Sequence, residues 1–312
     1  MSVNRGKMIA LAVALDLLMG EPPERWHPVV GMGRLVEKLE RRAPKEGPTR
    51  QLLYGGAMEV ACLTAAVLPA WTLERLLPSS LPLRGVALAL ALKPTFAIRA
   101  LFQFTGRVGR ALERGEMPEA RRAVGAIVSR DVEQLGEAGV AAAAVESLAE
   151  NASDSVVAPL LYYALFGLPG AYLYRMANTL DAMVGYRGKY EYLGKVAARV
   201  DDTLNLIPSR LSALATAASC WVAGGSPAAA WRAALRDSPH TASPNAGWPM
   251  AAVAGALDLR LEKADHYVLN PGGRLPGPHD LSTVRKMVGA SLVAALLGMI
   301  LIAGGSERGS RS

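Results

Sequence analysis

Acidic and amide side chains lie directly beside apolar, membrane-like sequence between residues 141 and 210. The first group contains Glu146, Glu150 and Asp154 at positions i, i+4 and i+8, with Asn151 close to them. This spacing predicts that the carboxylates share one helix face, where they repel each other unless cations neutralise them. Because Mg²⁺ prefers hard oxygen ligands, the group predicts a metal or substrate site. The competing explanation is a solvated helix face that precedes a membrane segment.

Two further clusters combine carboxylates, amides and arginines: Arg175, Asn178 and Asp181, and then Arg199, Asp201, Asp202, Asn205 and Arg210. Arginine matches phosphate or carboxylate oxygens, while Asp and Asn bind Mg²⁺ or orient a nucleophile. An internal salt-bridge network, in which Arg199 or Arg210 pairs with the acids at 201 and 202, is the competing explanation. Ionisable groups are costly beside a low-dielectric layer unless they are paired or bind a ligand. Several such clusters in one stretch favour a reaction site.

The segments that must position these groups are apolar helices. The chain has 312 residues, 51% of them hydrophobic, and its mean hydropathy of +0.20 is high for a soluble enzyme. Residues 287–305 carry no charged side chain, and their number is about what crosses a bilayer. Less regular apolar segments occupy residues 52–71 (with Glu59), 83–104, 156–174 and 203–224. We therefore expect an all-α fold: a polytopic membrane protein with several imperfect spans.

The net charge of +7 fits a membrane protein better than a nucleic-acid-binding protein. Lys and Arg concentrate in the connections 21–51, 107–130 and 187–199, which by the positive-inside tendency face the cytoplasm. Basic connections also meet anionic lipid headgroups without any other ligand. Strict alternation of spans across the membrane then fails, because the connection 187–199 is basic as well. Segment 156–174, which lies between two of the basic connections, is interrupted by prolines and glycines. We expect it to be re-entrant or to form two short helices.

We expect one integral membrane domain over residues 1–305 and a disordered tail over 306–312. The domain includes a polar amphipathic insert at about 105–140 and a polar cap at about 226–280, which is dense in Pro, Gly and Asn. The insert is predicted to contain helices over 107–114, 118–130 and 131–151.

Other polar motifs carry weaker predictions. Ser129-Arg130-Asp131 alone is typical of a surface ion pair, and His27 of a hydrogen-bonded structural residue. Residues 243–249, with Asn245 and Trp248, predict an irregular loop that packs on the tryptophan or contacts a ligand. The sequence has no P-loop, no Gly-x-Gly-x-x-Gly and no Gly-x-Ser-x-Gly, so a bound nucleotide would use none of these motifs.

Six motifs then occur in order: Leu15-Asp16-Leu17-Leu18-Met19-Gly20-Glu21-Pro22 with His27-Pro28-Val29; Ser129-Arg130-Asp131; Glu146-Ser147-Leu148-Ala149-Glu150-Asn151-Ala152-Ser153-Asp154; Asn178-Thr179-Leu180-Asp181-Ala182-Met183-Val184-Gly185-Tyr186; Ala198-Arg199-Val200-Asp201-Asp202 with Asn205 and Pro208; and Ser243-Pro244-Asn245-Ala246-Gly247-Trp248-Pro249. From about Asp16 to Gly273, the chain resembles the CobD/CbiB type of cobalamin biosynthesis protein, the adenosylcobinamide-phosphate synthase. Lys93-Pro94-Thr95 departs from the expected pattern, because it puts a charge inside an apolar segment.

The resemblance implies a multi-pass enzyme of the cell inner membrane whose active site faces the cytoplasm. It would join the propionate carboxylate of adenosylcobyric acid to the amine of (R)-1-aminopropan-2-ol or of its O-phosphate, as an ATP-dependent carbon–nitrogen (acid–amine) ligase with Mg²⁺. The implied partners are the corrinoid, the amine and the lipid bilayer, with other corrin-assembly enzymes as further candidates and no nucleic acid.

The motif positions of this family carry hypothetical roles in the present chain. The metal side is assigned to Glu146, Glu150, Asp154 and Asp181. The catalytic group is Asp201, Asp202 and Asn205, in which one aspartate accepts the proton of the attacking ammonium. Phosphate or substrate is assigned to Arg130, Arg199, Arg210, Asn151, Asn178 and Asn245.

Two other functions fit the same residue types. A Mg²⁺-dependent membrane prenyl- or alcohol-phosphate transferase would also hold its pyrophosphate on acid-rich helices. A transporter or assembly scaffold would use buried acids as an ion pathway instead of a reaction site. The sequence also leaves open whether the amine acceptor is phosphorylated.

Overall fold

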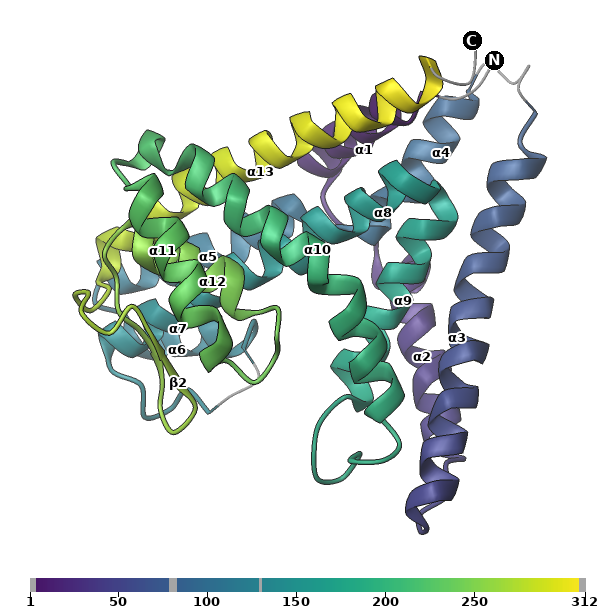
Figure 1. The fold of residues 1–312 in the computed structure, drawn as a ribbon, viewed down its shortest axis with the longest axis horizontal. Helices are drawn as coiled ribbons and strands as arrows, with labels where there is room; N and C mark the ends of the chain where they lie inside the picture. The colour runs from purple at the N-terminus through teal and green to yellow at the C-terminus, as the bar shows by residue number, and fades with distance from the viewer. Residues whose placement is uncertain (1–3, 79–82, 129–130, 309–312) are drawn as a thin grey trace. The chain divides into compact units, whose positions relative to one another are not determined.

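The protein is almost entirely helical in the computed structural model, which describes residues 4–78, 83–128 and 131–308 (Figure 1). The helices are α1 (Arg5–Met19), α2 (Pro28–Glu40), α3 (Pro48–Leu76), α4 (Arg84–Leu92), α5 (Ile98–Glu113), α6 (Met117–Gly125), α7 (Glu137–Ala152), α8 (Ala158–Phe166), α9 (Leu168–Val184), α10 (Lys195–Ser219), α11 (Pro227–Asp237), α12 (Gly247–Ala256) and α13 (Pro278–Arg308). Between them lie a π-helical turn, η3 (Ser153–Val157), and the 3₁₀ turns η1 (Glu24–Trp26), η2 (Lys93–Thr95), η4 (Cys220–Ala223) and η5 (Ser238–His240). The helical class predicted from the sequence is confirmed.

A small antiparallel hairpin is the exception to the helical pattern. Strands β1 (Leu261–Lys263) and β2 (Tyr267–Leu269) pair with Leu261 opposite Leu269. Strands of this length are too short to give a recognisable alternation of polar and apolar residues, so the sequence did not predict them.

The chain forms two compact units, each built from separate stretches of sequence. Unit 1 comprises Met1–Ala97, Ala158–Asn205 and Gly298–Ser312, and unit 2 comprises Ile98–Val157 and Leu206–Leu297. The single membrane domain over 1–305 stays a prediction. Helix α13 continues to Arg308 and so includes the start of the segment 306–312 that was expected to be disordered.

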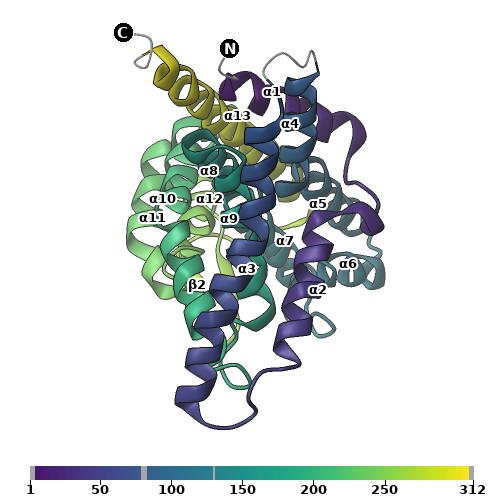
Figure 2. The same ribbon diagram turned by 90° about the vertical axis from the view of Figure 1, so that its right-hand side faces the viewer.

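Helices α2, α3 and α9 pack together in unit 1 (Figure 1, Figure 2). Their buried core consists of Met32, Val36, Met58, Cys62, Ala66, Met176, Leu180 and Val184. A side chain at Gly55 of α3 would collide with the backbone carbonyl of Leu193, so glycine lets α3 approach the connection after α9 closely. This packing sets α3 beside the end of α9 and the start of α10.

The interrupted segment predicted over 156–174 forms the helix pair α8 and α9. Gly167 separates them with a φ of 74°, a left-handed conformation that favours glycine. The next backbone amide, of Leu168, donates to Glu74 Oε2 of α3 at 2.9 Å, and the rings of Tyr162 and Tyr174 stack with centroids 5.4 Å apart. Two helices are therefore present, and a re-entrant placement in a membrane stays a prediction.

Three described helical stretches are long and apolar enough to cross a membrane: Pro48–Leu76, Arg84–Glu113 and Pro278–Ala303. They correspond to the predicted apolar segments 52–71, 83–104 and 287–305. These stretches support a membrane protein.

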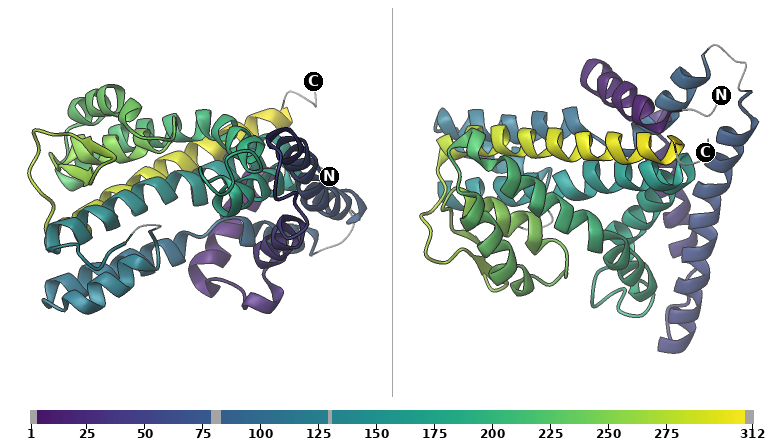
Figure 3. Two further views of the ribbon diagram at one scale, coloured as in Figure 1. Left: turned by 90° about the horizontal axis from the view of Figure 1, so that it is seen from below. Right: turned by 45° about the horizontal axis from the view of Figure 1, so that its top comes forward.

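The structure explains the unexpected charge of Lys93. Helices α1 and α4 pack side by side (Figure 3, right), and Lys93 follows α4 directly. Its ammonium, 7% exposed, lies 3.3 Å from Asp16 Oδ1 and 2.9 Å from Glu21 Oε1. His27 in turn contacts Glu21 Oε2 at 2.9 Å, and its other ring nitrogen accepts the Val29 amide, which confirms its structural role.

Two predicted helix boundaries in unit 2 are wrong. Helix α6 ends at Gly125 and α7 begins at Glu137, so the helices predicted over 118–130 and 131–151 are too long toward each other. The exposed Asp131 accepts the Glu133 amide at 2.9 Å. Such local side-chain bonds compete with helix formation, and this explains why the helix does not begin at Asp131.

Candidate functional site

Asp201 is the centre of a hydrogen-bonded group in unit 1. It is 9% exposed and lies in the second turn of α10. Asn178 Nδ2 of α9 donates to its Oδ1 at 3.3 Å, and Asn205 Nδ2 donates to its Oδ2 at 2.9 Å. The fully buried Tyr174 donates its hydroxyl to Asn205 Oδ1 at 2.8 Å. The amides therefore hold both oxygens of the Asp201 carboxylate and fix its direction.

Burial and neighbouring acids raise the pKa values of two carboxyl groups in this site, those of Asp201 and Asp181. Burial raises the pKa of Asp201 to about 6, with a contribution from Asp202 and against the hydrogen bonds from Asn178 and Asn205. Burial, together with the charges of Asp201 and Asp202, raises the pKa of Asp181 to about 7. Carboxyl groups that titrate in this range are suited to proton transfer at physiological pH.

The competing salt-bridge explanation required Arg199 or Arg210 beside these acids. Arg199 is exposed, and its main-chain carbonyl accepts the Thr203 hydroxyl. Arg210 lies in unit 2 and its guanidinium bonds there to other groups. Among the described residues, neither of these two arginines therefore pairs with Asp201, which accepts hydrogen bonds from Asn178 and Asn205.

Glu59 of α3 belongs to the same group, although it lies outside the predicted clusters. It is 3% exposed and interacts electrostatically with Asp181 and Asp201. Neither of its carboxylate oxygens has a hydrogen-bond partner within the described ranges. A single acid inside an apolar span is by default a functional candidate, so the signal was present in the sequence.

Helix α7 in unit 2 carries the first predicted group. Glu146 is 5% exposed, and the neighbouring Ser147 hydroxyl donates to the Ile127 carbonyl at 3.0 Å. The Asn151 amide donates to the Ser147 carbonyl at 2.9 Å and accepts the Ser155 hydroxyl at 3.3 Å. The amide of Asn151, predicted to bind substrate, is thus engaged along its own helix.

The π-helical turn η3 modifies the predicted carboxylate stripe. Glu150 lies in α7, but Asp154 lies in η3, where the backbone no longer follows the α-helical repeat. The assumption of one regular helix from Glu146 to Asp154 is therefore wrong at its last two residues. Single π turns inside α-helices occur often at functional sites.

Arg210 and Asn245, both predicted to bind substrate or phosphate, are brought together in unit 2. Arg210 donates to Asn245 Oδ1 at 2.8 Å and to the Pro244 carbonyl at 3.4 Å, and its guanidinium lies 4.7 Å from the centre of the Trp248 ring. The Ser209 hydroxyl also donates to Asn245 Oδ1, at 3.3 Å. The loop predicted over 243–249 ends earlier, because α12 begins at Gly247.

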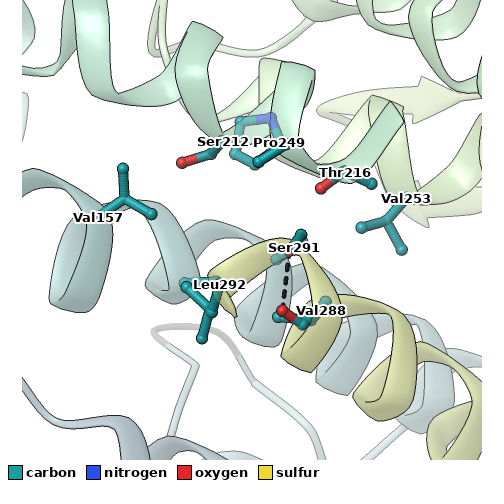
Figure 4. A pocket seen from close by; sticks show the side chains of 11 residues that line it. Val157, Ser212, Thr216, Pro249, Val253, Val288, Ser291 and Leu292 are labelled. Carbon is teal, nitrogen blue, oxygen red and sulfur yellow. Dashed lines mark hydrogen bonds between the residues drawn. The ribbon is translucent and has the colours of Figure 1, made fainter. Parts of the chain in front are cut away.

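Unit 2 also contains a small pocket (Figure 4). Its volume is about 10 Å³, room for about one water molecule. The hydroxyls of Ser212 and Ser291 on its wall donate to carbonyls of their own helices, at 2.9 Å and 2.8 Å. It is a packing void, and none of the predicted site residues lines it.

The predicted residues are thus divided between the units. Unit 1 holds Asn178, Asp181, Arg199, Asp201, Asp202 and Asn205, and unit 2 holds Glu146, Glu150, Asn151, Asp154, Arg210 and Asn245. Arg130 lies outside the described residues. Within residues 4–78, 83–128 and 131–308, no group of three or more His, Cys, Asp and Glu side chains is arranged to hold a metal ion. The metal assignments of Glu146, Glu150, Asp154 and Asp181 therefore stay predictions.

Comparison with known proteins covers nearly the whole chain. Residues 9–293 match the family model described as CobD/Cbib protein. "Cobalamin biosynthesis protein CobD" of Dehalococcoides mccartyi is 42% identical over 273 residues, 87% of this chain and 89% of that protein. The proteins of the same name from Chromobacterium violaceum and Geobacter metallireducens are 44% and 39% identical, covering 85% and 95% of this chain and 84% and 96% of their own lengths. No solved structure matches the chain.

Proposed function

Because this chain belongs to the CobD/CbiB family, we propose that it acts in cobalamin biosynthesis as an adenosylcobinamide-phosphate synthase. The proposed substrates are adenosylcobyric acid, ATP and (R)-1-aminopropan-2-ol or its O-phosphate. The observation that carries the proposal is the buried Asp201, which is oriented by two amides and titrates near neutral pH.

The reaction needs activation of a carboxylate, which is a poor electrophile. The propionate oxygen attacks the γ-phosphorus of ATP, giving an acyl phosphate and ADP. The amine nitrogen then attacks the acyl carbon, the carbon–oxygen bond to phosphate breaks, and amide and inorganic phosphate form. The ammonium must lose a proton before it attacks, and a second proton leaves the nitrogen as the amide forms. One of these protons stays on hydrogen phosphate and the other is released.

Asp201 is suited to accept the proton of the ammonium. A base is most effective when its pKa lies near the working pH, and the pKa of Asp201, raised by burial to about 6, approaches that condition. Asn205, Asn178 and Tyr174 are positioning residues in this proposal, because their hydrogen bonds aim the carboxylate without reaching the reacting atoms. This changes the role predicted for Asn205, from a catalytic to a positioning residue, and that predicted for Asn178, from a substrate-binding to a positioning residue.

Arg210 is the proposed anion-binding residue of unit 2. Its contacts with Asn245 and Trp248 restrict the guanidinium, so a carboxylate or phosphate would meet a donor that is already oriented. Arg199 and Arg130 remain proposed phosphate ligands from the family motifs.

Mg²⁺ enters the proposal as part of the co-substrate Mg-ATP. Mg²⁺ is commonly held by one or two carboxylates together with substrate phosphates, and the described acids do not enclose an ion by themselves. The metal roles of Glu146, Glu150, Asp154 and Asp181 stay predictions, and no step above depends on them.

The test uses purified full-length protein with adenosylcobyric acid, Mg-ATP and either 1-aminopropan-2-ol or its O-phosphate. Mass spectrometry should find the corrinoid amide, with one ADP formed per amide, and the two parallel reactions identify the preferred acceptor. An unchanged corrinoid under both conditions would contradict the proposal. Turnover of a prenyl or alcohol phosphate instead would favour the transferase, and no chemistry at all the transporter or scaffold.

A further inference from the structure

Glu59 is an acid whose burial the fold does not explain. It lies in α3, a stretch apolar and long enough to cross a membrane, and is 3% exposed. Both carboxylate oxygens lack a hydrogen-bond partner in the described part of the chain. Protonation does not remove the difficulty, because a neutral carboxyl would still leave its O–H without an acceptor. A buried polar group of this kind is costly unless a ligand completes it.

The acids near Glu59 make its negative charge still less favourable unless a cation binds there. The charged groups that act on it are Asp181 and Asp201, both acids. Asp181 lies in the last turn of α9, where the helix C-terminus adds negative potential, and its carboxylate is packed against Gly185. Acids of α3, α9 and α10 in unit 1 are thus close enough to interact electrostatically.

The arrangement favours an organic ammonium over a metal ion. Mg²⁺ requires oxygen ligands at roughly 2.0–2.1 Å in a near-octahedral shell. The described acids form no such group. An ammonium accepts wider spacing, because it donates hydrogen bonds of roughly 2.7–2.9 Å to separate carboxylates. Glu59, Asp181 and Asp201 lie on separate helices, and an ammonium can bridge such carboxylates without a closed metal shell.

We propose that Glu59, Asp181 and Asp201 form the binding pocket for the ammonium group of the amine substrate, with Glu59 as its innermost charge. This inference rests on the proposed function and assigns Asp181 to the amine instead of the metal. Asp201 then serves twice, because the carboxylate that helps to hold the ammonium is the one that accepts its proton. Glu59 stabilises the bound cation and leaves the reacting carbonyl to other groups.

The first experiment measures binding without turnover. Full-length protein in detergent is unfolded thermally with 1-aminopropan-2-ol alone, or with propane-1,2-diol, which has a hydroxyl in place of the ammonium. The amine should raise the Tm and the diol should not. Equal shifts from both compounds would overturn the pocket, and this comparison needs no variant.

The second experiment uses Glu59→Gln, which keeps the shape and removes the charge. The KM for the amine should rise about tenfold or more, while the KM for adenosylcobyric acid stays unchanged, and the amine-dependent Tm shift should disappear. The matched control is Glu37→Gln, an exposed acid on α2 that pairs with Arg41 and should change neither quantity. Without ligand, Glu59→Gln should be at least as stable as wild type; a lower Tm would indicate a structural acid.

The outcomes separate this pocket from the proposed function. Amide formation with an unchanged amine KM in Glu59→Gln would overturn the pocket and leave the ligase intact. An amine-specific shift that Glu59→Gln abolishes, in a protein that makes no amide, would keep the pocket and overturn the ligase. If Glu59→Gln does not fold, Glu59→Asp, which keeps the charge, should retain a smaller amine-dependent shift, and its complete loss would count against the pocket.

Discussion

The Asp201 carboxylate accepts hydrogen bonds from the amides of Asn178 and Asn205, and Asn205 is held in turn by the Tyr174 hydroxyl. Replacing Asp201 with asparagine should lower kcat for amide formation by roughly 10²–10⁴-fold, the usual effect of removing a general base. The protein should still insert into membranes, because the substitution keeps the shape of the side chain. Corrinoid mass analysis and membrane flotation measure the two properties.

Asp202→Asn is the comparison that identifies the proton acceptor. Asp202 contributes charge to Asp181 and Asp201. Its loss should therefore reduce turnover less than the loss of Asp201. A larger effect at Asp202 would move the proton acceptor to that residue, whereas normal turnover in both variants would remove both from the site.

Asn205 controls the pH at which Asp201 is ionised. Burial raises the pKa of Asp201, and the hydrogen bond from Asn205 lowers it. Asn205→Ala removes the lowering contribution, so the pKa of Asp201 should rise above about 6. Less base is then ionised at a given pH, and the acidic limb of kcat/KM should move to higher pH. A pH profile with an unmoved acidic limb would remove Asn205 from this role.

At the scale of elements, Gly167 sets the turn between α8 and α9. Alanine there would adopt a φ of 74° and place its Cβ against the Glu74 carboxylate. Gly167→Ala should therefore lower the free energy of unfolding by about 1–3 kcal/mol. Thermal unfolding in detergent measures the change.

Gly31 of α2 is the matched control for this substitution. No heavy atom lies within 4 Å of a Cβ built there, and the residue is inside a regular helix. Gly31→Ala should leave stability unchanged or raise it by up to about 1 kcal/mol. A loss at Gly31 as large as at Gly167 would show that the turn geometry is not the cause.

The long apolar elements could be predicted from the sequence because hydropathy and length are local properties. The three stretches that could cross a membrane coincide with predicted apolar segments. Helix ends were harder to predict from the sequence. The hydrogen bond of the Asp131 side chain and the π turn at Ser153 both depend on local geometry that residue spacing does not encode. The hairpin at Leu261 was missed for lack of any periodic signal.

The candidate site could be predicted only in part. Helical spacing groups residues of one helix, such as Asp201 and Asn205, and these two are indeed bonded. The bonds that span separate helices, such as Asn178 to Asp201, depend on how α9 and α10 pack. Glu59 has no partner at helical spacing, and its signal in the sequence was instead its position inside an apolar span.

For the whole molecule, chelation should separate catalysis from stability. Excess EDTA should stop amide formation, because the proposed co-substrate is Mg-ATP. It should leave the Tm unchanged, because in this proposal Mg²⁺ binds together with ATP as co-substrate and not as a resident ion that stabilises the fold.

Amide formation and Tm are both measured on the same purified sample. Full activity in EDTA would exclude a Mg²⁺-dependent reaction. A fall in Tm would show that an ion is part of the folded protein, and would return the acids of α7 and η3 to consideration as its ligands.

Unit 1 is built from stretches that are far apart in the sequence, and this affects folding during synthesis. Met58 and Cys62 on α3 share their core with Met176 and Leu180 on α9. A ribosome translates the whole of Ile98–Val157, which belongs to unit 2, before it reaches α9. Until α9 has been synthesised, the face of α3 that packs against it therefore stays uncovered. Nascent chains arrested before α9 should be sensitive to proteases and holdase chaperones, and release of a longer chain should end that exposure.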